Sequence, residues 1–169
     1  MDNEYHKEER SFLMSYIRAS EWTDPALLAP YLRAADIEEI DAATHLSPYE
    51  VLQAGYSLGE PCRTFVGDSG NVAGMFGVTP IPTEGNVKIG VIWCLTTPEL
   101  FKMKKYFMRN CRREIQEITQ QYDKVINFVY EKNTTHIRWI KAMGFKMEAS
   151  PRPFGWQEKP FYYFEKVIT

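Results

Sequence analysis

The sequence predicts one mixed α/β (α+β) domain, with a largely antiparallel sheet flanked by helices. The chain has 169 residues, the size of a single hydrophobic core, and its 44% hydrophobic and 14% aromatic content is enough to fill one. Branched and aromatic runs alternate with helical stripes in the order strand, helices, three strands, helix, strand, helix, strand. We assign this domain to residues 12–169 and expect the polar residues 1–11 to form a lead-in.

The first part of the chain is predicted to hold a strand and three helical stretches. Pro25 suits the first position of a helix, and Pro30 breaks that helix. Ser47 precedes Glu50 by three residues, which is the spacing of a capping box. The predicted elements are a strand at 12–19 and helices from residue 24, at 36–43 and at 48–56.

The second part is predicted to add a hairpin, two buried strands, two helices and a final strand. A turn signal at 68–71 separates two short apolar runs, Thr97 begins a cap-proline-acid helix start, and Gly144 suits a helix end. The predicted elements are strands at 63–67, 72–78, 87–95, 125–130 and 161–168, a loop at 79–86, a long helix after Thr97 and a helix at 133–143.

Apolar stripes indicate which helix faces are buried. Ile37 and Ile40 lie three residues apart and are expected to share a buried face. The long helix carries a stripe spaced by three or four residues. Its members are Phe107, Cys111, Ile115, Ile118 and Tyr122.

Composition excludes several classes of protein. The formal net charge is −2, so no overall field attracts nucleic acid or an anionic membrane. No run of 18 apolar residues and no secretory leader is present, which predicts a cytoplasmic protein. The three cysteines form no CxxC pair and do not combine with histidines at metal-ligand spacing, so we predict no disulfide framework and no metal site.

Three segments give the chain a resemblance to the GNAT fold of N-acetyltransferases. IRASEWTD at 17–24 resembles the opening strand and helix, and VIWCLTTP followed by a long helix is similar to the place where that family binds acetyl-CoA. NTTHIRWIKAMGF at 133–145 resembles the stretch that begins at an asparagine and ends at Gly-Phe. NFVYEKNTTHIRWIK at 127–141 is also similar to a segment of the GNAT-like proteins of short-tailed bacteriophages, including an internal virion protein.

The resemblance implies a coenzyme site that this chain fills poorly. Family members hold the coenzyme pyrophosphate on a glycine-rich turn that opens the long helix, whereas positions 101–106 contain no glycine and crowd the backbone. We therefore expect no cofactor, or acetyl-CoA if the chain is active. The cofactor-binding candidates, which this reading treats as vestigial, are Leu95, Thr96, Thr97, Lys102, Lys104, Lys105 and Asn133.

The general acid and the general base that the resemblance implies are also missing from their expected positions. Ile140 stands where the family often has a tyrosine that acts as a general acid, and residues 87–95 contain no carboxylate to act as a base. Tyr130 and His136 remain as candidate catalytic residues. Local packing is the alternative role for His136.

Two surfaces are candidates for contact with partners. Arg138, Phe154 and Trp156 are candidate interface residues, although the aromatic pair is equally compatible with a loop folded over the sheet edge. Lys105, Arg109 and Arg112 belong to a basic run that could contact DNA, or form a solvated helix face.

These observations favour a phage-type GNAT-fold protein with a degenerate acyl-CoA site. It would act inside or on the virion, or in assembly, through contacts with other phage proteins, and would lie in the virion or the host cytoplasm. The first alternative is an active acetyl-CoA-dependent N-acetyltransferase that modifies a protein or a small amine. The second is a DNA-contacting protein.

Overall fold

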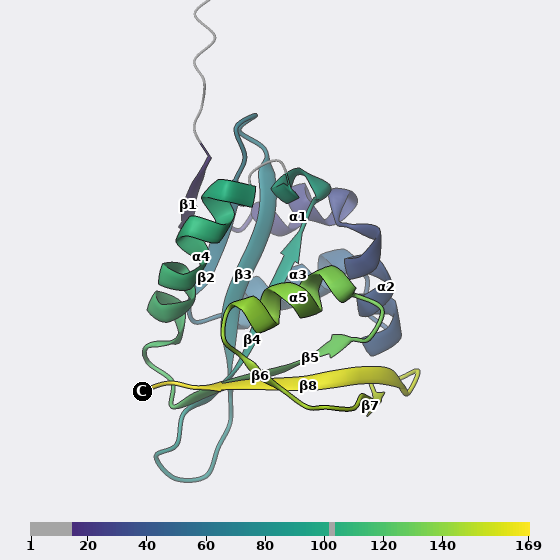
Figure 1. Cartoon of the computed structure of the whole chain (residues 1–169). Helices are drawn as coiled ribbons and strands as arrows, with labels where there is room; N and C mark the ends of the chain where they lie inside the picture. Colours follow the sequence, from purple (N-terminus) through teal and green to yellow (C-terminus); the bar gives the residue numbers. More distant parts are fainter. Residues whose placement is uncertain (1–14, 102–103) are drawn as a thin grey trace, which may run out of the picture.

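The computed structural model describes residues 15–101 and 104–169 (Figure 1). The predicted lead-in at 1–11 and the start of the first predicted strand lie outside this part, so the domain boundary stays a prediction. The elements are β1 (Tyr16–Ala19), α1 (Asp24–Leu28), the 3₁₀ turn η1 (Ala29–Tyr31), α2 (Ala34–Ala43), α3 (Pro48–Leu58), β2 (Cys62–Val66), β3 (Val72–Ile81), β4 (Ile89–Thr96), the 3₁₀ turn η2 (Pro98–Phe101), α4 (Lys104–Thr119), β5 (Lys124–Tyr130), α5 (Thr134–Ala142), β6 (Lys146–Met147), β7 (Arg152–Phe154) and β8 (Lys159–Val167).

The strands form one sheet in the order β1-β2-β3-β4-β5-β8-β6, with β7 paired to β8. Every pairing is antiparallel except the one between β4 and β5, which is parallel. The predicted fold class is therefore confirmed. A parallel pair needs a crossover connection, and α4 supplies it between β4 and β5.

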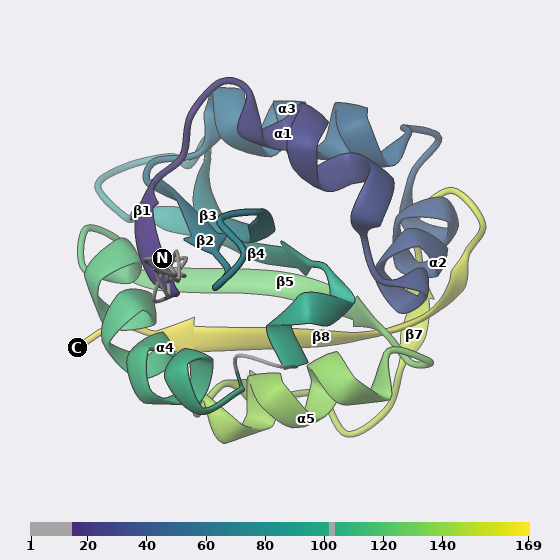
Figure 2. The ribbon, with the colours of Figure 1, turned by 90° about the horizontal axis from the view of Figure 1, so that it is seen from above.

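Helices cover both faces of the sheet. Figure 2 shows α1 and α3 on one side and α4 and α5 on the other. The larger core lies under α4 and α5 and contains the predicted stripe, with Phe107, Cys111, Ile115 and Ile118 all buried. Tyr122 is buried as well, three residues beyond the end of α4. The second core joins α1 and α3 to β3 and β4.

The local signals for helix α3 and the hairpin are confirmed. The Ser47 side chain accepts the Glu50 N–H, and the Glu50 carboxylate accepts the Ser47 N–H, so the capping box is complete. The turn at 68–71 joins β2 to β3, as the sequence predicts. Gly144 follows α5 with a φ of 81°, the left-handed conformation that favours glycine.

Three predicted boundaries are wrong. The long helix begins at Lys104, because the Thr97 signal caps the turn η2: the Thr97 hydroxyl accepts the Glu99 N–H at 3.2 Å. Strand β3 continues through Pro80 into the predicted loop, since β2 pairs only as far as Gly77 and leaves an edge where proline is tolerated. Strand β8 starts at Lys159 and pairs with two short strands, β6 and β7, that no sequence pattern indicated.

The buried face of α2 also differs from the prediction. Ile40 is buried, but Ile37 is 42% exposed. Asp36, four residues before Ile40, takes the second inward position and is 1% exposed. The face turns because the carboxylate of Asp36 accepts hydrogen bonds inside the protein.

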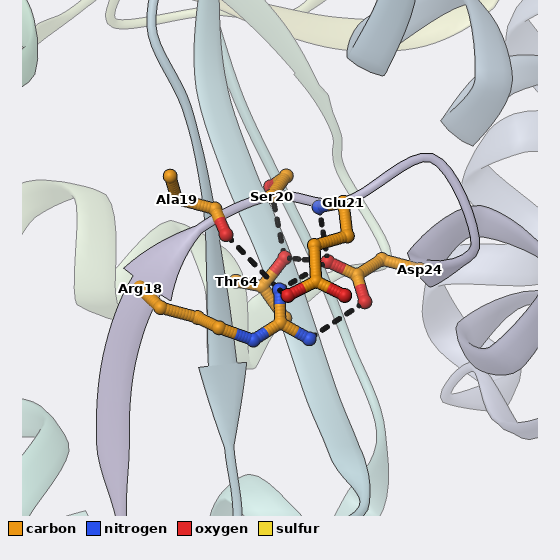
Figure 3. Close-up of polar contacts among 6 residues, drawn as sticks. All are labelled: Arg18, Ala19, Ser20, Glu21, Asp24 and Thr64. Carbon is orange, nitrogen blue, oxygen red and sulfur yellow. Dashed lines mark hydrogen bonds and ion pairs between the residues drawn. The ribbon is translucent and has the colours of Figure 1, made fainter.

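A buried carboxylate fixes the connection between β1 and α1 (Figure 3). Asp24 is fully buried and accepts two hydrogen bonds from the Arg18 guanidinium, at 2.7 and 2.8 Å. The Thr64 hydroxyl and the Glu21 N–H donate to the same carboxylate. Asp24 thus serves as an anchor in the core, while Thr23 at the helix start makes no side-chain cap.

Candidate functional site

Strands β4 and β5 separate and leave a gap between them. Their parallel pairing covers only Ile89 with Lys124, Gly90 with Val125 and Val91 with Ile126. Beyond that point β4 rises beside β3, whereas β5 crosses the molecule beside β8 (Figure 1). The backbone groups along the separated edges need partners, because unpaired buried amides and carbonyls are unfavourable.

Asn127 bridges the gap at its narrow end. Its Nδ2 donates to the Ile92 carbonyl of β4 at 2.7 Å, and its Oδ1 accepts the N–H of Phe128 at 2.7 Å. One amide side chain on β5 thereby replaces the backbone pairing that the separated strands have lost. The sequence prediction did not single out this residue.

Helix α2 caps the far ends of both strands. The Asp36 carboxylate accepts the Thr96 N–H of β4 at 3.2 Å, and the Arg33 N–H donates to the Thr96 carbonyl at 3.0 Å. The Glu39 carboxylate accepts the Tyr130 N–H of β5 at 2.9 Å. Backbone groups of both strands are therefore occupied by this chain itself.

Asn133 belongs to the same set of contacts. Its side chain is 1% exposed, and its Nδ2 donates to Asp36 Oδ1 and to Glu39 Oε2, both at 3.2 Å. Arg33 forms an ion pair with Asp36 and lies 3.5 Å from Asn133 Oδ1. We call these four residues, Arg33, Asp36, Glu39 and Asn133, the α2 polar cluster.

The buried setting shifts the pKa values of Glu39 and His136. Burial, reinforced by the charge of Asp36, raises the pKa of Glu39 to about 7, although the hydrogen bond from Tyr130 opposes this shift. Burial lowers the pKa of His136 to about 4, so its imidazole is uncharged at neutral pH. A carboxyl group with a pKa near 7 can accept or release a proton under physiological conditions.

Two cavities lie beside the gap. One of about 380 Å³ is bordered by Glu39, Asn127 and His136 among other residues. The other, of about 400 Å³, lies between β4, α4 and α5, and we call it the α4–α5 pocket. Its lining includes Cys94, Thr96, Phe107, Met108, His136 and Trp139.

The structure brings some cofactor-binding candidates together and separates others. Thr96 and Asn133 both contact Asp36 beside the gap, whereas Leu95 points into the core under α1 and α3. Thr97 is buried and holds η2. Lys102 and the side chains of Lys104 and Lys105 lie outside the described part of the structure.

The catalytic candidates lie in different surroundings. His136 borders both cavities. Tyr130 is buried in a separate aromatic cluster, with its ring 5.1 Å from that of Phe161. Ile140 is fully buried in the core, so no proton donor reaches the gap from its position.

Of the interface candidates, one is packed against another aromatic ring and two are exposed. Phe154 stacks on Phe128 with ring centroids 4.0 Å apart, which is the folded-back alternative. Trp156 is 48% exposed, although its indole N–H donates to the Asp41 carbonyl and its ring contacts His45. Arg138 is exposed at the edge of the α4–α5 pocket.

Sequence reasoning missed Arg33, Asp36, Glu39 and Asn127 as site residues. The first three recur every three residues, a spacing that places them near one side of a helix, and this was the available signal. Their partners on β4, on β5 and at the start of α5 lie 60 to 100 residues away in sequence, so these contacts had no local signature. In the described residues, no three His, Cys, Asp or Glu side chains come together as metal ligands, and no helix is long and apolar enough to span a membrane.

Comparison with known proteins gives one family-model match and many structures of similar fold. Residues 76–149, less than half of the chain, match the model of a family described as bacteriophage T7, probable scaffold protein Gp13. No curated protein matches the chain.

Many solved structures share the fold. An acetyltransferase of the GNAT family from Streptococcus pneumoniae aligns with a TM-score of 0.61 at 15% identity, over 92% of this chain and 99% of the other. Spermidine N-acetyltransferase from Vibrio cholerae, solved with CoA and spermine, aligns with a TM-score of 0.65 at 13% identity. The alignment covers 92% of this chain and 96% of the other. Ard1 from Thermoplasma volcanium aligns with a TM-score of 0.66 at 14% identity, over 92% of this chain and 98% of the other. The resemblance to the GNAT fold is therefore confirmed at the level of fold.

Proposed function

We propose that this chain is a phage assembly or virion protein that has the acetyltransferase fold and does not use its coenzyme site. The observation that carries the proposal is that the chain's own side chains bind backbone groups at both ends of the β4–β5 gap. Asn127 occupies the Ile92 carbonyl, and the α2 polar cluster occupies the strand ends. It acts through contacts with other phage proteins rather than by catalysis.

These contacts oppose coenzyme binding for an energetic reason. A coenzyme arm lying between the two strands would displace Asn127 from Ile92 and would separate Asp36 from Thr96. Each buried polar group left without a partner costs about 1–3 kcal/mol, so the displaced groups would offset much of the binding free energy.

The phosphate end of the site supports the same conclusion from the sequence. Positions 101–106 contain no glycine, and the helix of this crossover starts at Lys104 after the separate turn η2. The cradle that the resemblance implies depends on bare backbone approaching the phosphates. Lys102, Lys104 and Lys105 would at most supply point charges, as parts of a vestigial site.

The viral assignment rests on two similarities. The family model of a phage scaffold protein matches residues 76–149, and the segment at 127–141 resembles GNAT-like proteins of short-tailed phages. Location inside the virion, alongside other virion proteins, is our extension of these similarities. Arg138 and Trp156 are the exposed interface candidates available for such contacts.

Two measurements test this function. Purified protein is titrated with acetyl-CoA to millimolar concentration in a thermal shift assay, and no rise in Tm is expected because a ligand that binds only the native state must stabilise it. Particles of the source phage are analysed by mass spectrometry, and the chain is expected at a fixed copy number in them or in assembly intermediates. Stabilisation by acetyl-CoA together with acetylation of an amine would overturn the proposal.

One observation favours an active N-acetyltransferase as a second candidate function. Glu39 borders the cavity next to the gap, and its pKa of about 7 suits a general base that takes a proton from an amine. In that case Glu39→Gln would abolish acetyl transfer while leaving acetyl-CoA binding intact. The absence of any acetyl-CoA binding by the unaltered protein removes this candidate.

A further inference from the structure

Charge is divided unequally between two parts of the chain. Residues 15–87 contain three basic and ten acidic side chains, a formal charge of −7. Residues 88–169 contain 15 basic and eight acidic side chains, a formal charge of +7. The formal net charge of −2 conceals this division. A charge asymmetry of this size indicates electrostatic interaction with a partner.

The fold places the two parts on opposite sides of the sheet. Figure 2 shows α1 and α3, which belong to the acidic part, on one side and α4 and α5, which belong to the basic part, on the other. Because the sheet lies between the two pairs of helices, their exposed charges form separate surfaces.

Helices α1 and α3 are flanked by negative charges. Glu21 precedes α1, Glu50 lies in the first turn of α3, Glu60 follows α3, and all three side chains are exposed. Arg33 is the one basic residue between positions 20 and 60, and it forms an ion pair with the buried Asp36. The exposed charges of this segment are therefore all negative.

Large apolar side chains are exposed on the same layer of helices. Trp22 is 76% exposed, and Leu27 of α1 and Tyr31 of η1 are exposed as well. Tryptophan and tyrosine are frequent anchors of protein–protein interfaces. We call the surface formed by these three residues and the three glutamates the α1–α3 acidic surface. Its chemistry suits a protein partner that carries positive charge.

Helices α4 and α5 carry the complementary charges. Arg109 and Arg138 are exposed and form no ion pair with any residue that the structure describes. Glu117, the exposed carboxylate of α4, lies 3.8 Å from the Arg113 guanidinium and is offset by it. Met108 is exposed beside Arg109 and adds an apolar group. We call Met108, Arg109 and Arg138 the α4–α5 basic surface.

We propose that copies of this chain associate head to tail, with the α1–α3 acidic surface of one copy on the α4–α5 basic surface of the next. Carboxylates face guanidinium groups across the contact, and Trp22 and Met108 supply apolar area. Because the two surfaces lie on opposite sides of the sheet, one copy cannot use both on the same neighbour. Association therefore gives open chains or closed rings rather than a two-fold dimer.

Nucleic acid is the alternative occupant of the α4–α5 basic surface. A polyanion would contact Arg109 and Arg138, but it would be repelled by the formal charge of −7 on residues 15–87. It would also leave the exposed Trp22 and Tyr31 without a role. A second copy of the chain uses both surfaces, so we choose it as the partner. The inference goes beyond the assembly role and does not depend on it.

Sedimentation equilibrium of the purified chain, from micromolar to millimolar concentration and without coenzyme or nucleic acid, is the first test. In about 50 mM salt the weight-average mass is expected to rise with concentration and to pass that of a dimer. In about 500 mM salt the association constant is expected to be about tenfold lower, because exposed charges are screened. A monomer at every concentration, a mass that stops at the dimer, or association that salt does not weaken would overturn the proposal.

Two variants, each altered on one surface, test the direction of the contact. Glu21→Gln with Glu50→Gln weakens the acidic surface and keeps an acceptor for the capping box, and Arg109→Gln with Arg138→Gln weakens the basic surface. Each variant alone is expected to have an association constant about tenfold lower. In an equimolar mixture the intact basic surface of the first meets the intact acidic surface of the second, so 1:1 dimers are expected. A mixture no heavier than the separate variants would contradict the head-to-tail arrangement.

Glu84→Gln with Lys159→Gln is the matched control. Both residues are exposed and lie outside the two surfaces, in the β3–β4 connection and at the start of β8. This variant is expected to associate like the unaltered protein, and equal losses in the control and the surface variants would overturn the proposal.

Trp22→Ala tests the apolar part of the contact. The variant is expected to associate more weakly at both salt concentrations, because burial of apolar area is not screened by salt. Retention on DNA by a chain that stays monomeric would assign the basic surface to nucleic acid and overturn the proposal. Failure of these tests leaves the assembly role in place, because that role is tested with acetyl-CoA and purified particles.

Discussion

Asn133 has the position in the motif that the resemblance predicts, but its side chain is hydrogen-bonded to residues of this chain. The resemblance assigns the asparagine at the start of this helix to coenzyme binding, and Asn133 does begin α5. Its amide group donates to Asp36 and Glu39 and is almost completely buried. The identity of the residue was visible in the sequence, but the two carboxylates that occupy it come from a distant helix.

Glu39 is predicted to make stability depend on pH. Its pKa of about 7 in the folded state exceeds the ordinary glutamate value, so the folded state binds the proton more tightly and this contribution to stability falls as pH rises from about 4.5 to 7. Glu39→Gln removes the buried charge and retains an acceptor for Tyr130. The variant is expected to be more stable than the unaltered protein above pH 7, by on the order of 1–3 kcal/mol, with the difference shrinking towards pH 5.

Urea unfolding at several pH values measures this difference. Glu38→Gln is the matched control, because Glu38 is exposed and its ion pair among the described residues is with Lys132 at the surface. A stability difference between Glu39→Gln and the unaltered protein that stays constant from pH 5 to 8 would contradict the raised pKa.

Asp24 is predicted to have the opposite pH dependence. Burial raises the pKa of its carboxyl, but the hydrogen bonds from Arg18, Glu21 and Thr64 outweigh burial and hold it below the ordinary value. Its stabilisation is therefore present above about pH 4 and is lost as pH falls through the lower folded pKa. Asp24→Asn is expected to cost about 2–4 kcal/mol at pH 7, because a buried ion pair loses one partner.

The loss is measured by urea unfolding at pH 7 and at pH 3. At pH 3 the difference in the free energy of unfolding between Asp24→Asn and the unaltered protein should be smaller. Glu21→Gln serves as the control, since Glu21 lies 3.7 Å from the Arg18 guanidinium but is 63% exposed. A cost for Glu21→Gln as large as that for Asp24→Asn would contradict the anchoring role.

At the scale of elements, α2 and Asn127 replace strand pairing that β4 and β5 lose. Asn127→Ala leaves the Ile92 carbonyl without its partner, and the expected cost is about 1–2 kcal/mol. Asn110→Ala is the control, because the hydrogen bonds of the Asn110 side chain to described residues lie within helix α4. The two costs are compared by thermal or urea unfolding, and equal values would mean that the bridge does not stabilise the gap.

The basic face of α4 has two arginines with different settings. Arg112 donates to the Ala142 carbonyl at 2.9 Å and so links α4 to α5, whereas Arg109 is exposed. Arg112→Gln is expected to lower stability by about 1 kcal/mol, and Arg109→Gln to leave it unchanged within error. DNA contact by this face stays a prediction. Salt-dependent retention on DNA that falls equally in both variants would support it, and unchanged retention in both would contradict it.

The elements with strong local signals were predictable. The capping box at Ser47, the turn at 68–71 and the stripe from Phe107 to Ile118 each depend on residues close in sequence. Strands β6 and β7 were not, because two or three residues paired to β8 leave no periodicity. The late start of α4 was missed because Thr97 caps a short 3₁₀ turn with the same signal that begins a helix.

At the scale of the whole molecule, the alternation of strands and helices was enough to predict the fold, and the site was not predictable to the same extent. The fold depends on many local patterns that agree with one another. The site depends on a few contacts between α2 and the ends of β4 and β5, which only the folded chain brings together. The bonding of these strand ends is therefore a property of the tertiary structure.

A crystal structure of the chain grown with millimolar acetyl-CoA tests most directly whether these contacts exclude the coenzyme. We expect Asn127 to remain bonded to the Ile92 carbonyl, Asp36 to the Thr96 N–H, and no coenzyme between β4 and β5. Coenzyme lying between these strands, with Asn127 turned away from Ile92, would contradict the account.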